Sequence, residues 1–239
     1  MYESTFGMLL KWHEEDGIRM KRLFLVTVWT CGFFLWGSLP AQALLLGFEN
    51  ITNNEPANAA IGEAQLFVDV TDTGLGVNQV LFTFFNTGPD ASSICDVYFD
   101  DGTLLGIASI DNSSSGVSFS QFAKPGELPG ANNVTPPFET IAGFSADSDS
   151  PVQPNGVNPG EYLGILFDLQ TGGIFSDVIT ELASGELRIG IHVQGFSDGG
   201  SESFINDPPP TNTPEPATML LVGSGLIGLA SFRKIFRKS

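Results

Sequence analysis

The chain has 239 residues, of which 27 are acidic and 10 are basic, and its formal net charge at pH 7 is −17. The basic residues gather at the two ends, and between residues 44 and 213 just Lys124 and Arg188 are basic. A surface of this sign excludes nucleic acid as a partner and disfavours binding of the body to an anionic membrane.

The N-terminal region predicts a secretory signal peptide over residues 20–43. Lys21-Arg22 precede an apolar run from Leu23 to Leu39, and Ala41-Gln42-Ala43 forms a small-x-small cleavage site, so we expect cleavage after Ala43. Residues 1–19 contain several acidic side chains, which signal peptides seldom carry in this position. We therefore expect them to be an upstream extension ahead of a true start at Met20; an unusually long n-region is the alternative.

The body, residues 44–206, predicts a mainly β fold. Short apolar segments, several of them alternating with polar residues, are separated by clusters of Gly, Pro, Asn and Ser. The expected strands include residues 66–70, 80–85, 94–99, 104–110, 117–121, 138–144, 162–169 and 187–193. Such a series indicates a jelly-roll-like β-sandwich around one core.

Three further features complete the predicted body. The apolar residues between Ile174 and Leu182 lie on one helical face, and Gly185 follows where a helix C-cap is expected, so one short helix is predicted. The turn Asp100-Asp101-Gly102 predicts that the strands on either side of it pair as a hairpin. Residues 124–137 are rich in Pro and Gly and predict a long loop, and residues 207–213 predict a stiff spacer.

Carboxylates are the one abundant type of ionisable side chain in the body. Two groups of aspartates fall in predicted loops and are the candidate calcium ligands: Asp96, Asp100 and Asp101, and Asp147 and Asp149. Neither group has the spacing of an EF-hand, so ordinary polar turns are the alternative. His192 is the one histidine of the body, and no Gly-x-Ser-x-Gly motif occurs, which argues against serine hydrolase chemistry.

Two alternative functions stay open beside that of a non-enzymatic protein: a module that binds a ligand, and an enzyme that hydrolyses a substrate. A calcium-dependent glycan-binding module would expose Tyr98 or Tyr162 beside the aspartate loops. A carboxylate-based glycoside hydrolase would place two acids across a groove, with the pKa of one of them raised. No spacing in the sequence selects such a pair, and we therefore expect no catalytic residues.

The C-terminal segment, residues 214–239, combines three features in a fixed order. Pro214-Glu215-Pro216 is followed by an uncharged stretch from Ala217 to Phe232, and a basic cluster comes last. The stretch predicts a single transmembrane helix, and the positive-inside rule keeps the basic cluster cytoplasmic. Its apolar character rests on Met219, Leu220, Leu221, Val222, Leu226, Ile227 and Leu229, and the basic stop-transfer residues are Arg233, Lys234, Arg237 and Lys238.

This segment resembles the PEP-CTERM sorting domain of Gram-negative bacteria. The resemblance implies that an exosortase recognises and processes the chain at Pro214, Glu215 and Pro216. It also implies a link to exopolysaccharide and biofilm. We therefore expect an exported, non-enzymatic surface or matrix protein that is first anchored in the inner membrane by its C-terminus and then processed, with the exosortase as partner, exopolysaccharide as a further candidate, and no cofactor unless calcium binds.

Overall fold

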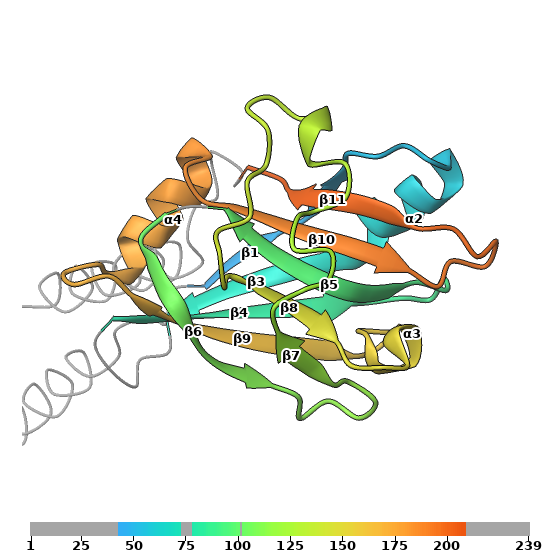
Figure 1. Ribbon diagram of the computed structural model, residues 1–239, viewed down its shortest axis with the longest axis horizontal. Helices are drawn as coiled ribbons and strands as arrows, with labels where there is room; N and C mark the ends of the chain where they lie inside the picture. The colour runs from blue at the N-terminus through green and yellow to red at the C-terminus, as the bar shows by residue number, and fades with distance from the viewer. Residues whose placement is uncertain (1–42, 73–77, 101, 209–239) are drawn as a thin grey trace, which may run out of the picture. The chain divides into compact units, whose positions relative to one another are not determined.

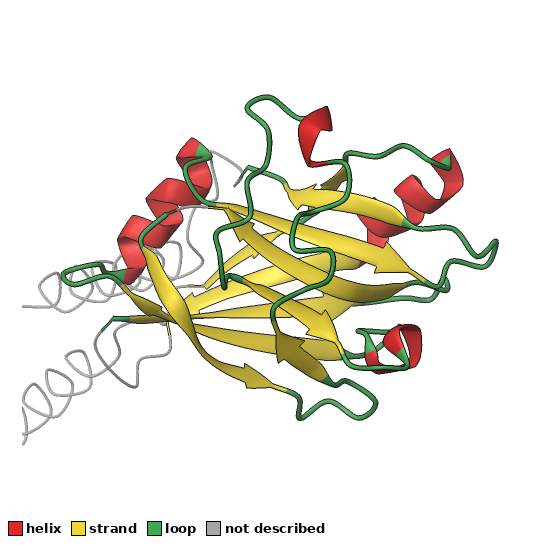
Figure 2. Cartoon of the chain, viewed as in Figure 1, coloured by secondary structure: helices red, strands yellow, loops and turns green. Residues whose placement is uncertain are grey.

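The computed structural model describes residues 43–72, 78–100 and 102–208 of the chain. These residues form two antiparallel β-sheets that pack face to face, with short helices at their ends (Figures 1 and 2). The mainly β class predicted from the alternating segments is therefore confirmed. The fold is a sandwich in which both sheets contribute to one apolar core.

Sheet A has five described strands and sheet B has six. In spatial order, the strands of sheet A are β1 (Ala43–Leu46), β3 (Leu66–Asp72), β4 (Gln79–Asn86), β9 (Tyr162–Leu169) and β6 (Leu104–Asp111). The strands of sheet B are β2 (Phe48–Asn50), β11 (Glu202–Asn206), β10 (Arg188–Gln194), β5 (Ser93–Asp100), β8 (Ser145–Ser148) and β7 (Phe119–Gln121).

The core between the sheets follows from the period of two along the strands. In β3 and β4 every second residue is buried, and these residues meet the inward side chains of β5 and β10. Three phenylalanines mark the centre of the contact: Phe99 of sheet B lies 4.9 Å from Phe82 and 4.6 Å from Phe167 of sheet A, measured between ring centroids, in edge-to-face geometry. Aromatic pairs of this geometry add to the free energy of burial.

Among the described residues, three α-helices and one 3-10 helix lie outside the two sheets. They are α2 (Pro56–Gln65), α3 (Val152–Asn155), α4 (Phe175–Ser184) and η1 (Ala131–Asn133). Helix α4 is the helix that the sequence predicted: Val178 and Leu182 face the core, and Gly185 adopts the left-handed conformation, with φ of 78°. The expectation of a single helix is wrong, because α2 and α3 are also present.

Two further predictions about the strands are corrected by the structure. The strands on either side of residues 100–102 do not form a hairpin: β5 pairs with β10 and β8, whereas β6 pairs with β9 in the other sheet. The segment 138–144 is not a strand. It belongs to a long loop between β7 and β8, residues 122–144, which crosses the outer face of sheet B (Figure 1) and is called here the covering loop.

The two predicted address segments lie almost entirely outside the described residues. Ala43 is described and is the first residue of β1, where it pairs with Thr71. The sorting motif, the predicted membrane helix, the basic cluster and Ala41 lie outside. Within residues 43–208, as far as they are described, no helix has the length and the apolar character needed to cross a bilayer.

Candidate functional site

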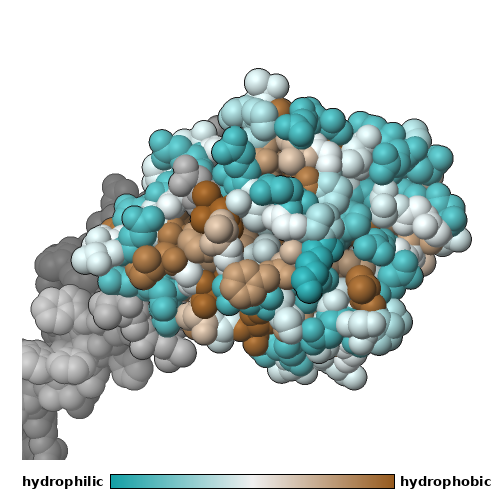
Figure 3. Space-filling view, viewed as in Figure 1, coloured by the Kyte–Doolittle hydropathy of each residue, from teal (hydrophilic) through white to brown (hydrophobic). Residues whose placement is uncertain are grey.

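The covering loop packs on the outer face of sheet B over a small apolar cluster. Hydrophobic and hydrophilic residues are intermingled on the surface of this side of the body (Figure 3). Tyr98 of β5 donates a hydrogen bond from its hydroxyl to the carbonyl of Pro125, at 3.0 Å. Leu128 and Phe138 of the loop pack over Gly190 of β10, where a Cβ atom would lie just 2.7 Å from Leu128 and 3.1 Å from Phe138. The absence of a side chain at Gly190 thus lets the loop lie directly on the sheet.

An ion pair fixes the same loop at its far end. The guanidinium of Arg188 contacts the carboxylate of Asp100 and donates to the carbonyls of Pro136 and Pro137, both at 2.7 Å. The guanidinium carbon also lies 5.4 Å from the ring centroid of Phe138. Asp100, one of the candidate calcium ligands, is therefore occupied by a cation of the chain itself.

Asp96, Asp147 and His192 form the second polar group on this face. His192 Nδ1 and Asp96 Oδ2 are 2.9 Å apart, and Asp96 is just 2% exposed. Asp147 lies opposite Asp96 in the register of β8 and β5. Oδ1 of Asp96 has no donor among the described residues, although the side chain of Asp147 is within hydrogen-bonding range of Asp96. A proton on the carboxyl group of Asp147 would supply the missing donor.

The pKa values agree with this geometry. Burial, and then the negative charge of Asp96 and the hydrogen bond to it, raise the pKa of Asp147 to about 6. The backbone and charge of Lys124, from the covering loop, act in the opposite direction but are weaker. Asp147 consequently holds its proton more tightly than an ordinary aspartate does.

The remaining candidate calcium ligands are not gathered at one place. Asp149 accepts hydrogen bonds from Ser118 at 2.7 Å and from Ser120 at 2.8 Å, and these bonds lower its pKa. Asp101 lies outside the described residues. Among the described residues, no group of three or more Asp, Glu, His or Cys side chains is arranged to hold a metal ion.

The two tyrosines of the glycan-binding reading lie on opposite faces of the sandwich. Tyr98 is fully buried beneath the covering loop, which contradicts the expectation that it could be exposed. Tyr162 is 37% exposed, but it lies on the outer face of sheet A, away from the aspartates of sheet B. The exposed fraction of the His192 side chain is 13%, and the ring contacts Asp96.

Glu202 is a functional group of the fold that sequence patterns did not reveal. This carboxylate is buried, and it accepts hydrogen bonds from the side chains of Asn50 and Thr52 and from the backbone N–H groups of Asn54 and Glu55. Burial alone would raise the pKa of Glu202, but these bonds outweigh it and lower the pKa. The carboxylate therefore ties the segment before α2 to β11.

Comparison with protein families decides what the C-terminal segment is. The model of the PEP-CTERM protein-sorting motif matches residues 212–237, which include Pro214, Glu215 and Pro216. The chain carries a PEP-CTERM protein-sorting motif. The motif marks an exported protein that is sorted by a membrane-anchored signal and processed by an exosortase. Neither the curated proteins nor the solved structures gave a match to the chain.

The PEP-CTERM motif covers about a tenth of the chain, and it indicates how the protein is sorted and processed. The body, whose sandwich and covering loop are described above, lies outside the matched residues.

Proposed function

We propose that this chain is a non-enzymatic component of the cell surface or extracellular matrix, associated with biofilm exopolysaccharide. A signal peptide over residues 20–43 exports it, the apolar stretch 217–232 holds it in the inner membrane, and an exosortase then processes it at Pro214-Glu215-Pro216. The PEP-CTERM match over residues 212–237 is the observation that carries the proposal.

The order of the predicted segments supports this sequence of events. A charged n-region, an apolar run and a small-x-small site precede the body, and the sorting motif follows it. β1 begins at Ala43, so a mature chain that starts at Leu44 keeps the pairing of Leu44, Leu45 and Leu46 with β3. The acidic body, with Lys124 and Arg188 as its basic residues, suits solubility outside the cell.

The test is to replace Pro214, Glu215 and Pro216 together with alanine, and to express the chain in a bacterium that has an exosortase. We expect the unchanged chain to lose its C-terminal segment and to leave the inner membrane, whereas the variant stays there at its larger mass. Mass spectrometry of the membrane and extracellular fractions separates the two.

The matched control replaces Pro208, Pro209 and Pro210, three residues of the neighbouring spacer, with alanine. It changes the same number of residues and removes backbone rigidity close to the motif, but it keeps Pro-Glu-Pro. The control should be processed normally, and so should the unchanged chain in every strain that keeps the exosortase gene. Processing of the triple motif variant, or of the unchanged chain after deletion of the exosortase, would refute the proposal.

The positions of the acids support the non-enzymatic part. Asp147 has the raised pKa that an acid catalyst needs, but its neighbour Asp96 is buried and cannot serve as the second carboxylate on a substrate. On sheet A, Asp72 and Asp111 line one hollow, but three strand spacings and three residues of register separate them. Their Cα atoms are thus roughly 17 Å apart. Short side chains cannot reduce this to the about 5–9.5 Å between glycosidase carboxyls.

A calcium ion at Asp96 and Asp147 is a second proposal, favoured by the unpartnered Oδ1 of Asp96. Calcium and the shared proton would compete for the same oxygens, so binding should strengthen above the raised pKa of Asp147. A ligand at a hundred times its Kd stabilises the folded state by about 2.7 kcal/mol. A rise in Tm with calcium over chelator, lost in Asp147→Asn and not produced by magnesium, would support it; equal Tm values would refute it.

The jelly-roll subtype of the sandwich also belongs to the proposal. The chain changes sheets between β1 and β2, β2 and β3, β4 and β5, β5 and β6, β6 and β7, β8 and β9, and β9 and β10. Repeated crossing between two antiparallel sheets is typical of jelly rolls. It supports this subtype over a stack of simple hairpins.

A further inference from the structure

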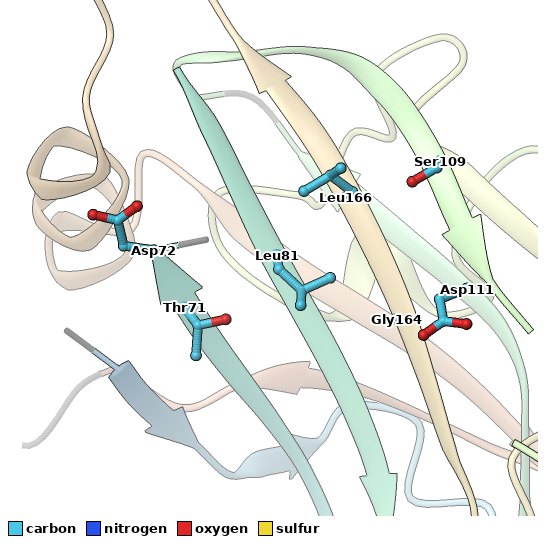
Figure 4. Close-up of a pocket in the computed structure, with 7 residues that line it drawn as sticks. All are labelled: Thr71, Asp72, Leu81, Ser109, Asp111, Gly164 and Leu166. Atoms are coloured by element: carbon cyan, nitrogen blue, oxygen red, sulfur yellow. The ribbon is translucent and has the colours of Figure 1, made fainter. Parts of the chain in front are cut away.

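The outer face of sheet A carries a hollow, called here the β9 hollow, with a volume of about 390 Å³. It crosses four neighbouring strands, β3, β4, β9 and β6, as Figure 4 shows. Leu81 and Leu166 lie in its centre, and Thr71 and Ser109 stand at its sides. Its volume falls in the range of about 300–1,000 Å³ that ligand sites occupy.

Gly164 of β9 lines the hollow without contributing a side chain to it. It lies between Thr83 of β4 and Asp111 of β6 in the strand register. A Cβ atom at Gly164 would lie 3.1 Å from the Cβ of Asp111 and 3.5 Å from Leu81, so a larger residue would crowd both neighbours. The carboxyl group of Asp111 lies beside the glycine (Figure 4).

The lining selects a ligand by charge and hydrogen bonding. Asp72 and Asp111 stand at opposite ends, Thr71 and Ser109 supply hydroxyls, and no Lys, Arg or His is among the residues of the lining. Carboxylates accept hydrogen bonds and repel anions. The leucines offer a flat apolar floor. A ligand that fits has many hydroxyl donors, an apolar face and no negative charge.

An aromatic row borders the hollow on the same face of the sheet. Phe67, Phe85 and Tyr162 are in register across β3, β4 and β9, one side-chain position from Gly164 along β9. The rings of Phe85 and Tyr162 are 6.4 Å apart, and Tyr162 is partly exposed with its hydroxyl 3.0 Å from Ser113 Oγ. An exposed ring with a polar tip is a surface on which the apolar face of a sugar can pack.

We propose that the β9 hollow and its aromatic row bind a neutral, hydroxyl-rich glycan. The carboxylates at the two ends accept hydrogen bonds from its hydroxyl groups, while the two leucines and Tyr162 contact its rings. Glycan binding rests on the proposed function, because export to the cell surface or matrix brings the body into contact with exopolysaccharide. The hollow itself belongs to the body, so a failure to bind glycan would leave the sorting at Pro214-Glu215-Pro216 untouched.

The test is isothermal titration calorimetry on the full chain in a detergent without a sugar headgroup. The probes are neutral hexasaccharides of glucose, galactose and mannose, with polygalacturonate as the anionic probe and oligolysine as the cationic peptide. We expect at least one neutral hexasaccharide to bind and polygalacturonate not to bind. Asp111→Asn keeps the size of the side chain and an acceptor for the Ser113 N–H, and should weaken binding about tenfold.

Filling the hollow gives the sharper comparison. Ser109→Phe places a ring in the β9 hollow at an exposed strand position and should abolish binding, and Tyr162→Ala should weaken it. The matched control is Ser120→Phe, at an exposed position of β7 in the other sheet, which should bind as the unchanged chain does. The proposal is overturned if no neutral hexasaccharide binds, if oligolysine binds instead, or if Ser109→Phe and Ser120→Phe bind alike.

Discussion

Replacing Asp147 with asparagine tests whether the carboxyl pair under the covering loop shares a proton. Asp147 faces Asp96 across the β5–β8 register, Lys124 approaches from the covering loop, His192 contacts Asp96 from β10, and Tyr98 lies on the same strand as Asp96. Asparagine keeps the size of the side chain, carries no charge and offers an N–H donor. It therefore imitates the protonated state of Asp147 at every pH.

The magnitude follows from the pKa of Asp147, which folding raises from 3.8 to about 6. The folded state holds the proton more tightly, so this contribution to stability is fully present below about pH 4 and is lost as the pH rises through 6. A fully buried group would lose about 3 kcal/mol over this window. Asp147 is only half-buried, and screening by solvent reduces the expected loss to about 1 kcal/mol.

The assay is urea unfolding of the unchanged chain and of Asp147→Asn between about pH 4 and pH 8. The variant should be more stable by about 1 kcal/mol at the upper end, and the difference should vanish at the lower end. Asp149→Asn is the matched control: the hydroxyls of Ser118 and Ser120 lower the pKa of Asp149, so this variant should be the less stable one at neutral pH. A destabilised Asp147→Asn at pH 8, or a difference that does not change with pH, would refute the shared proton.

Three other predictions concern packing, charge and reactivity. Gly62→Ala brings a Cβ atom to 2.1 Å from the Phe204 ring, and should lower the free energy of unfolding by about 1–3 kcal/mol, whereas Gly126→Ala, in open space, should not change it by urea titration. Arg188→Met leaves a buried carboxylate without its cation and should cost about 3 kcal/mol in the same titration. Cys95 is buried with its pKa raised to about 11, so its thiol should react with a thiol reagent at pH 8 in urea but not in buffer.

The sequence predicted those parts of the fold in which the local pattern and the tertiary environment agree. The alternation in β3 placed Leu66, Val68 and Val70 on the core face, where the structure buries them. The apolar face of α4 and the glycine that follows it, Gly185, were likewise sufficient to predict the helix. In these elements, burial on one face and a turn residue at the end are compatible with one type of secondary structure only.

The missed elements are those in which partners elsewhere in the chain decide the structure. β8 is made of small and polar residues, Ser145 to Ser148, and it is a strand because β5 and β7 pair with it on either side. Helix α2 consists largely of small residues, with weak amphipathic periodicity. The segment 138–144 contains several apolar residues and was predicted to be a strand. Instead, Phe138 packs on Gly190 and holds the covering loop against the sheet. Propensity is a weak prior against such contacts.

The candidate site could be predicted as a set of residue types but not as an arrangement. Aspartates 96 and 147 were singled out because acids crowd nearby in the sequence, yet they meet each other across two strands rather than within their own loops. The β9 hollow is a still clearer case, because its lining comes from four strands and its defining residue is Gly164, which contributes no side chain. Only the strand register brings these positions together.

Three acids of the body are stabilised by the fold in different ways. Glu202 is stabilised as a carboxylate by hydrogen bonds, Asp100 by the guanidinium of Arg188, and Asp147 is instead stabilised in its protonated form. The hydrogen bonds that lower the pKa of Glu202 contribute stability that is lost as the pH falls, whereas the raised pKa of Asp147 contributes stability that is lost as the pH rises. Lowering the pH should therefore loosen the contacts of β11, while it strengthens the β5–β8 pair.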